Sequence, residues 1–312
     1  MPPPIALTDL SKHYHNNGQP ITSVDCLTLT IPQGQIFGLL GPNGAGKTTT
    51  IKMLCGLITP TRGQICINGF DLRRQRSAAM RQIGAVLEGT RNIYWRLSAL
   101  QNLLYFGRLK GRPTAEIQGR SEQLLRRLGL WDRRNDPVAQ FSRGMQQKVA
   151  IACALISDPP ILLLDEPTLG LDVDAARVIK AWLPELARDH GKTILLTSHE
   201  LDTVEEVCER VVILRKGKVV ADQFVGELLK MFRTERYQIK LDGLLDDSQL
   251  PPLHDAVWSR LDDGMLLSVT LDRDQSIYSV LDQVRSAGHA LISVQRVEPD
   301  LEDVFIQLTS VR

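Results

Sequence analysis

The sequence of this chain predicts an α/β fold followed by a smaller α+β domain, and three observations favour that architecture. Its 312 residues suffice for about two domains, because single domains usually contain about 100–200 residues. Short, almost wholly apolar runs alternate with stretches of helical periodicity, the pattern of a parallel sheet covered by helices. Beyond about residue 233 the texture changes to hairpin and strand patterns with shorter helical stretches, which predicts a separate module.

The N-terminal part has the pattern of β structure. Leu27, Leu29 and Ile31 alternate with threonines, the period-2 pattern of a half-buried strand. Gln35–Leu40 is a short apolar strand, and a helical pattern extends over Lys47–Leu57 after a glycine-rich turn. A strand, a glycine-rich turn and a helix therefore follow one another here.

The middle of the chain contains a strand–helix–strand unit. Ile161–Leu164 and Thr193–Leu196 are short apolar runs that suit strands buried on both faces. Ala175–Arg188 between them has helical periodicity, so α/β is the class that this unit implies. Val211–Leu214 and Val219–Ala221 then predict a hairpin.

The last part of the chain is expected to fold on its own. A short helix over Gly226–Phe232 precedes a domain boundary near Arg233–Arg236, which divides the chain into domains 1–233 and 237–312. Asp262-Asp263-Gly264 is a good hairpin turn. The expected strands are Tyr237–Leu241, Val257–Leu261, Met265–Leu271 and Ala290–Val297, and the expected helices are Ser276–Ala287 and Leu301–Leu308.

The composition excludes several classes of protein. A charged share of 23% is typical of globular chains, and 37 Lys and Arg residues nearly balance 36 Asp and Glu residues, which disfavours nucleic acid as a partner. The apolar run Val149–Ile156 is too short to span a bilayer, so we expect no direct membrane insertion. Five cysteines without CxxC spacing and an N-terminus unlike a signal peptide favour a reducing compartment.

Residues 41–48 match the phosphate-binding pattern GxxxxGK[ST] at every fixed position. The predicted strand before them and the predicted helix after them are the context that this pattern requires. Lys47 can reach the β- and γ-phosphates of a nucleotide, and the Thr48 hydroxyl can bind Mg²⁺. The nucleotide-binding candidates are Gly41, Pro42, Asn43, Gly44, Ala45, Gly46, Lys47, Thr48 and Thr49.

An acidic pair, Asp165 and Glu166, follows the apolar run Ile161–Leu164. Ligands of open α/β sheets bind at the carboxyl ends of the strands, where this pair lies. We expect Asp165 to hold Mg²⁺ through a water and Glu166 to orient or deprotonate the attacking water. The alternative is a pair of solvated loop acids, which the phosphate-binding pattern upstream disfavours.

Three further segments, in their order along the chain, resemble the ATP-binding subunit of an ABC transporter. Phe141–Lys148 is similar to the signature motif of the family, Leu169–Asp172 to its D-loop, and Thr197–His199 to the segment of its switch histidine. The resemblance extends from residue 1 to about residue 230. It implies a P-loop NTPase core with an antiparallel β subdomain and a helical subdomain at about residues 89–157, with ATP and Mg²⁺ as cofactors.

The signature is usually LSGGQ followed by Gln-Gln-Arg/Lys, and this chain matches it only in part. Ser142 and Gly144 match, and Ser142 is also a good N-cap for the helix that follows, so an ordinary capped helix is the alternative. In the family, the signature of one subunit covers the γ-phosphate held by the other. The resemblance thus implies a head-to-tail dimer in which Ser142, Gly144 and Asp172 contact nucleotide. The positions that depart are Phe141, Arg143 and Met145.

Three other positions have a role only through the resemblance. His199, at the end of a strand, is expected to act with Lys47 and Glu166 in catalysis, although in isolation it would be an ordinary surface histidine. Tyr14 lies where the family stacks an aromatic ring on adenine; ordinary packing is the alternative. Glu88 stands where the family usually has glutamine, so we expect it to face Mg²⁺ or the attacking water and to add negative charge.

Residues 89–131 and the tail indicate what the ATPase drives. Residues 89–131 include five aromatic residues, and core packing is the expected role of most of them. In the family, the corresponding segment contacts a helix of the membrane subunit. Asp300–Leu308 resembles the ending of ATPases that serve drug- or antibiotic-resistance exporters with ABC-2-type permeases. The aromatic residues are Tyr94, Trp95, Tyr105, Phe106 and Trp131.

The resemblance implies an ATP-hydrolysing subunit of an ABC exporter. Two ATP-binding subunits, most simply a homodimer, close on ATP and act on a separate ABC-2-type permease, which would hold the chain at the cytoplasmic, inner face of the membrane. Whether the dimer is homomeric stays open. A soluble ABC protein acting on ribosomes or nucleic acid, and a non-hydrolysing ATP sensor, are the alternatives.

Overall fold

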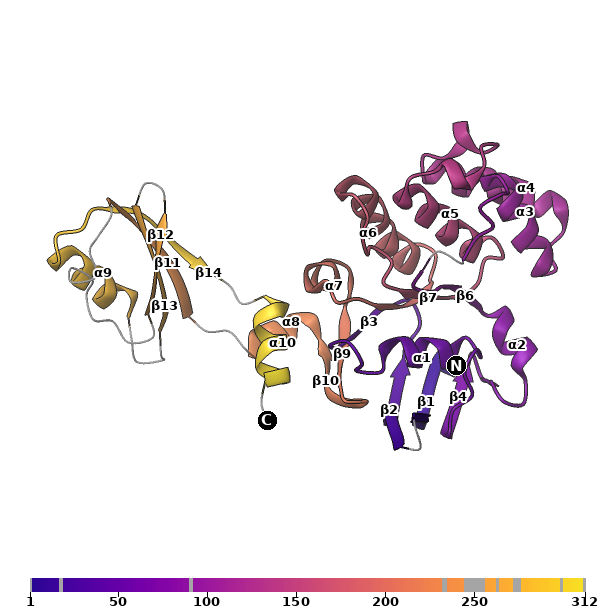
Figure 1. Cartoon of the computed structure of the whole chain (residues 1–312), viewed down its shortest axis with the longest axis horizontal. Helices are drawn as coiled ribbons and strands as arrows, with labels where there is room; N and C mark the ends of the chain where they lie inside the picture. Colours follow the sequence, from indigo (N-terminus) through magenta and orange to yellow (C-terminus); the bar gives the residue numbers. More distant parts are fainter. Residues whose placement is uncertain are drawn as a thin grey trace. The chain divides into compact units, whose positions relative to one another are not determined.

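The computed structural model describes residues 2–16, 19–89, 92–231, 235–243, 256–261, 264–271, 276–297 and 300–310. The chain divides into two compact units, residues 1–225 and 226–312 (Figure 1). The boundary predicted near Arg233–Arg236 falls partly on residues 233 and 234, which lie outside the described residues. Phe232 and the turn residues Asp262 and Asp263 also lie outside them.

A six-stranded sheet with the order β10-β9-β3-β8-β7-β6 forms the centre of the first unit. All neighbouring strands are parallel except the antiparallel hairpin β9–β10. The apolar runs predicted as strands form β3, β7 and β8, and every residue of these three strands is buried because helices or a second sheet cover both faces. The strands are β3 (Ile36–Leu40), β6 (Ile83–Val86), β7 (Ile161–Asp165), β8 (Thr193–Thr197), β9 (Arg210–Arg215) and β10 (Lys218–Phe224).

A second, antiparallel sheet of the first unit has the order β2-β1-β4-β5. The predicted alternation is confirmed in β2, where Leu27, Leu29 and Ile31 are buried and the threonines between them are exposed. These leucine and isoleucine side chains share one core with residues of α1 (Lys47–Leu54) and of the central sheet. The strands are β1 (Ile5–Asn16), β2 (Gln19–Ile31), β4 (Arg62–Ile67) and β5 (Phe70–Asp71).

Helices complete the first unit, and α3, α4 and α5 gather beside β6 and β7 in Figure 1 as the predicted helical subdomain. Helix α1 ends at Leu54 and not at Leu57, because Gly56 takes a positive φ of 65° that ends the helix. The other helices are α2 (Arg76–Arg81), α3 (Ala99–Leu109), α4 (Thr114–Arg127), α5 (Arg143–Leu155), α6 (Val173–Arg188) and α7 (Leu201–Val207), with 3₁₀ turns η1 (Trp131–Arg133) and η2 (Val138–Gln140).

The aromatic residues of the helical subdomain correct the expectation of core packing. Tyr94, Trp95 and Tyr105 are 50%, 46% and 42% exposed, and Phe106 and Trp131 are only half-buried. Tyr94 and Tyr105 contact each other edge to face, with ring centroids 4.9 Å apart. Phe106 contacts both tyrosine rings, so Tyr94, Tyr105 and Phe106 together form an exposed aromatic surface on the first unit.

The second unit is the predicted small α+β module. Its antiparallel sheet has the order β12-β13-β11-β14, and α9 contributes Val280 and Val284 to the core on one face of the sheet. Among the residues that the structure describes, no helix of either unit is long and apolar enough to cross a membrane. The elements are α8 (Val225–Met231), β11 (Glu235–Asp242), β12 (Ala256–Leu261), β13 (Gly264–Leu271), α9 (Ile277–Ser286), β14 (Leu291–Val297) and α10 (Leu301–Ser310).

Candidate nucleotide-binding and catalytic site

The glycine-rich segment Gly41–Thr48 joins β3 to α1, as predicted. A Cβ atom at Gly46 would lie 2.4 Å from the Ser23 carbonyl oxygen, so only glycine fits where the loop packs on β2. At Gly44 a Cβ atom would meet nothing within 4 Å, although φ is +81° there. One side of the loop thus packs on the fold and the other is open, which fits a cradle for phosphate groups.

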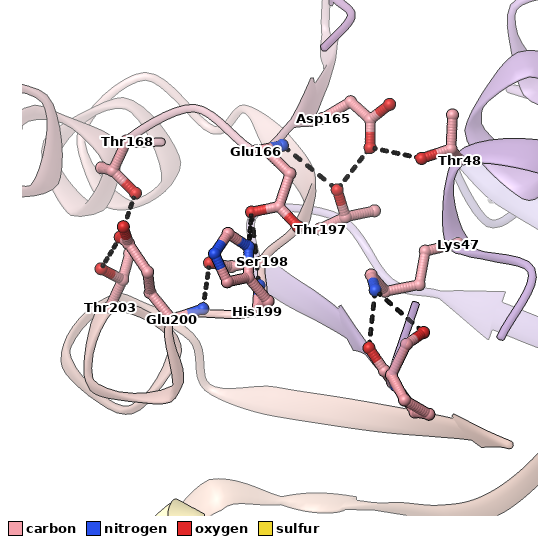
Figure 2. Close-up of polar contacts among 12 residues, drawn as sticks. Lys47, Thr48, Asp165, Glu166, Thr168, Thr197, Ser198, His199, Glu200 and Thr203 are labelled. Atoms are coloured by element: carbon pink, nitrogen blue, oxygen red, sulfur yellow. Dashed lines mark hydrogen bonds and ion pairs between the residues drawn. The ribbon is translucent and has the colours of Figure 1, made fainter. Parts of the chain in front are cut away.

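Lys47 begins α1 and is only 7% exposed. Its ammonium group donates to the carbonyl oxygens of Gly41, at 2.6 Å, and Pro42, at 3.4 Å (Figure 2). Burial lowers the pKa of Lys47, and the carboxylates of Glu166 and Asp165 oppose that shift. Among the described residues the Lys47 ammonium thus donates hydrogen bonds only to neutral main-chain oxygens, and a phosphate would offer it charged acceptors.

Asp165, at the end of β7, meets the hydroxyls of two threonines. Its Oδ1 accepts from Thr197 at 2.6 Å and from Thr48 at 3.4 Å, as Figure 2 shows. Its Oδ2 is buried and has no hydrogen-bond partner in the described part of the chain. A carboxylate oxygen with free lone pairs beside the Thr48 hydroxyl fits Mg²⁺, which takes one or two protein oxygens and binds phosphates and waters with the rest.

Glu166 and His199 form a hydrogen-bonded pair. The Glu166 Oε2 atom lies 2.9 Å from His199 Nδ1 and accepts from the His199 main-chain N–H at 3.3 Å. The Glu166 N–H donates to the main-chain oxygen of Thr197 at 3.1 Å. Glu166 has a positive φ of 52°, a conformation that costs free energy in a residue other than glycine and that occurs often at functional sites.

Glu88 follows β6 and lines a pocket together with Asp165, Glu166, Arg143 and Gln147. Its side chain is exposed. Among the described residues its carboxylate has no hydrogen-bond partner, so it is available to a ligand. The structure thus places Glu88 in the same pocket as the acidic pair, and its facing Mg²⁺ or the attacking water stays a prediction.

Replacing Glu88 with glutamine should shift the Mg²⁺ dependence of ATP hydrolysis. The change removes one negative charge from a pocket that already holds Asp165 and Glu166, so the metal should bind more weakly and half-maximal activity should need several-fold more Mg²⁺, about 2–10-fold by the usual size of such electrostatic effects. The measurement is phosphate release over a Mg²⁺ titration. An unchanged titration curve would contradict a role of Glu88 at the metal.

The signature and D-loop residues lie where two helices begin. Ser142 caps α5 by accepting from the Met145 N–H at 3.3 Å, which confirms it as an N-cap. Asp172 caps α6 by accepting from the Ala175 N–H at 2.7 Å. A Cβ atom at Gly144 would lie 2.6 Å from the Ala175 Cβ, so the start of α5 packs directly on the start of α6. Within the described residues no hydrogen bond joins these positions to the glycine-rich loop.

Tyr14 lies on β1 opposite Ile21 of β2, and 37% of it is exposed. The Lys12 ammonium lies 5.1 Å from the centroid of its ring. Further along β2, the Ser23 hydroxyl donates to the Thr49 hydroxyl at 2.9 Å, which connects β2 with the start of α1. The ring is therefore on the same sheet that supports the loop and is open to solvent.

Thr197 joins the candidate site by its hydrogen bond to Asp165, although the sequence alone suggests no role for its hydroxyl. In the parallel pair β7–β8 it lies in register with Asp165, so the hydroxyl and the carboxylate point to the same side of the sheet. The sequence does show a threonine at the end of a predicted strand. That this threonine lies beside Asp165 follows only once β7 and β8 are known to be neighbouring strands.

The loop before α1 with its buried lysine, the Thr48–Asp165 contact and the Glu166–His199 pair define a P-loop ATPase. Comparison with known proteins identifies the family. A family model described as ABC transporter matches residues 24–169. The ABC transporter ATP-binding protein NatA of Bacillus subtilis is 40% identical over 232 residues, which are 74% of this chain and 93% of the relative. The chain belongs to the ATP-binding proteins of ABC transporters, and it is an ATPase.

Other relatives differ in how much of the chain they match. The linearmycin resistance ATP-binding protein LnrL of Bacillus subtilis is 30% identical over 92% of this chain and 94% of its own length. The methionine import ATP-binding protein MetN of Symbiobacterium thermophilum is 39% identical over 72% of this chain and 69% of its own length. A dimeric structure of the ATP-binding cassette MJ0796, bound to ADP and Pi, has a TM-score of 0.65 at 28% identity and covers 70% of this chain and 98% of that one.

Proposed function

We propose that this chain is the ATP-hydrolysing subunit of an ABC exporter, in which ATP-driven closure of a dimer acts on a separate membrane permease. The observation that carries the proposal is the convergence of Lys47, Thr48, Asp165, Glu166 and His199 at the ends of β3, β7 and β8. A buried cation, a metal-binding oxygen pair and a histidine-bound carboxylate are the groups that phosphoryl transfer needs.

The chain's residues would act on ATP mainly by positioning. Lys47 binds the β- and γ-phosphates, and the loop N–H groups hold the phosphate chain. Thr48 and Asp165 hold Mg²⁺, which when bound neutralises charge on the phosphates. Glu166 accepts a proton from the attacking water or orients it, and His199 keeps its carboxylate in place.

The dimer is supported by the position of the signature and D-loop residues. Ser142, Gly144 and Asp172 lie at the starts of α5 and α6, where main-chain N–H groups favour an anion, yet this chain holds its own phosphate cradle elsewhere. We propose that they cover the ATP of a second ATP-binding subunit, with a homodimer as the simplest case. The similar MJ0796 structure is dimeric.

Export with an ABC-2-type permease is supported by the second unit. A match over 92% of the chain, as with the linearmycin resistance protein, must include most of residues 226–312, whereas a match over 72%, as with the methionine importer, need not. The ending Asp300–Leu308 resembles the same exporter group. We propose that the permease docks on the exposed aromatic surface of the helical subdomain. This contact would place the chain at the cytoplasmic face of the membrane.

We also propose that the Tyr14 ring stacks on the adenine of ATP.

Purification of the tagged chain from membranes should test the proposal. We expect a multispan permease to co-purify, and changing Tyr94 and Tyr105 to serine should release it, since the change removes exposed aromatic area while leaving the catalytic residues in place. Leu57→Ser, at an apolar residue that is 60% exposed outside this surface, is the matched control. Co-purified ribosomes or nucleic acid would instead support the soluble alternative and overturn the proposal.

A further inference from the structure

Two consecutive residues after β8 hold the segment that follows β7. His199 contacts the Glu166 carboxylate, and the next residue, Glu200, accepts a hydrogen bond from the Thr168 hydroxyl at 2.8 Å. Figure 2 shows both contacts between the same two loops. The turn that contains Glu166 is thus held at its first and third residues from one neighbouring loop.

The Glu200 carboxylate is itself fixed. The same Oε2 atom accepts from the Thr203 hydroxyl at 3.1 Å, and the Glu200 N–H donates to the Ser198 hydroxyl at 2.9 Å. Thr168 and Thr203 are each only 4% exposed, so water competes little for these bonds. Glu200 is the N-cap residue of α7 and therefore joins the Thr168 turn to a helix.

The turn needs such support because its backbone is strained. Glu166 has a φ of 52°, a left-handed conformation that is unfavourable for a residue with a Cβ atom. The proline that follows it restricts its backbone further. From the other side, the Gln147 amide donates to the Pro167 carbonyl at 3.1 Å. A conformation of this kind persists only where the surrounding contacts determine it.

We propose that Glu200 is a positioning residue for ATP hydrolysis. By accepting the Thr168 hydroxyl it keeps the strained turn in the conformation in which the Glu166 carboxylate meets His199. Because the Leu171 N–H donates to the Thr168 carbonyl at 3.2 Å, the same bond also fixes the start of the segment that leads to α6. The inference rests on the proposed role of Glu166 in hydrolysis.

The test compares steady-state ATP hydrolysis by the full chain carrying Thr168→Val or Glu200→Ala. Each change removes one end of the bond, so we expect kcat to fall about tenfold while KM for ATP changes less than about twofold. Thr168→Ser and Glu200→Gln keep a hydroxyl and an acceptor oxygen and should retain most of the wild-type kcat. Asp202→Ala, an exposed change in the first turn of the same helix, is the matched control.

The double variant Thr168→Val/Glu200→Ala separates positioning from general destabilisation. If both residues act through one bond, its kcat should be no lower than that of the worse single variant. Additive losses, losses that follow the melting temperature, or wild-type kcat in both single variants would overturn the inference.

Glu166→Gln, measured beside these variants, distinguishes the two levels of the proposal. If the Glu166→Gln variant is inactive and the Glu200→Ala variant has the wild-type kcat, only the role of Glu200 is overturned. Full turnover in Glu166→Gln overturns the catalytic role of Glu166 and, with it, the inference about Glu200.

Discussion

Replacing Glu166 with glutamine should lower the rate of ATP hydrolysis at least about 100-fold, the usual contribution of a positioned general base. Glutamine has nearly the same shape and can still accept a hydrogen bond from His199, but it cannot take a proton from water. ATP binding should persist, because Lys47 and the glycine-rich loop are unchanged. Phosphate release and binding of a fluorescent ATP analogue, measured on the same preparation, give the two quantities separately.

The matched control for this change is Glu122→Gln on α4. Glu122 forms an exposed ion pair with Arg126, one helical turn away, and such pairs contribute little. Hydrolysis by the control should equal that of the wild type. A Glu166→Gln variant that still hydrolyses ATP at more than about one tenth of the wild-type rate would contradict the assignment of Glu166 as the base.

Replacing Lys47 with alanine should weaken ATP binding by about 10–100-fold, the range expected when one or two charge-assisted hydrogen bonds are lost. Lys47 is buried at the loop, so water cannot readily replace its ammonium group beside the phosphates. Hydrolysis should fall below detection for the same reason. Titration of the fluorescent ATP analogue measures the dissociation constant directly.

Lys52 of the same helix is the control for Lys47. It lies in the last turn of α1, away from the loop, and Lys52→Ala removes the same charge from the same element. Its ATP affinity should match the wild type. Equal affinities of the Lys47 and Lys52 variants would mean that the ammonium group of Lys47 does not bind phosphate.

Local patterns were sufficient to predict the elements that support the site. The runs that form β3, β7 and β8 are almost wholly apolar because both faces of the central sheet are covered, and this pattern can be read from the sequence without knowing which strands are neighbours. The helix from Lys47 and the cap at Ser142 are likewise local, since a helix start depends on a few adjacent residues. Asp165 and Glu166 were found because they end such a run.

Contacts between distant segments could not be predicted in the same way. Strands β1 and β4 pair over a long sequence separation, and nothing local specifies that register. The bond from Thr168 to Glu200 joins two loops that only the sheet order brings together. The exposure of the Tyr94 and Tyr105 rings could not be predicted either. Periodicity indicates which face of a helix a residue lies on, but not how deeply that face is covered by the rest of the fold.

The contact between Gly144 and Ala175 has a consequence for how the sequence can change over evolutionary time. A Cβ atom at position 144 would lie 2.6 Å from that of Ala175, so the two positions share one small volume. A larger side chain at one of these positions would be tolerated only if the side chain at the other became smaller. Because glycine and alanine are already the two smallest residues, few such exchanges are possible. The two positions should therefore covary as a pair, with their combined size held nearly constant even where the surrounding signature residues differ.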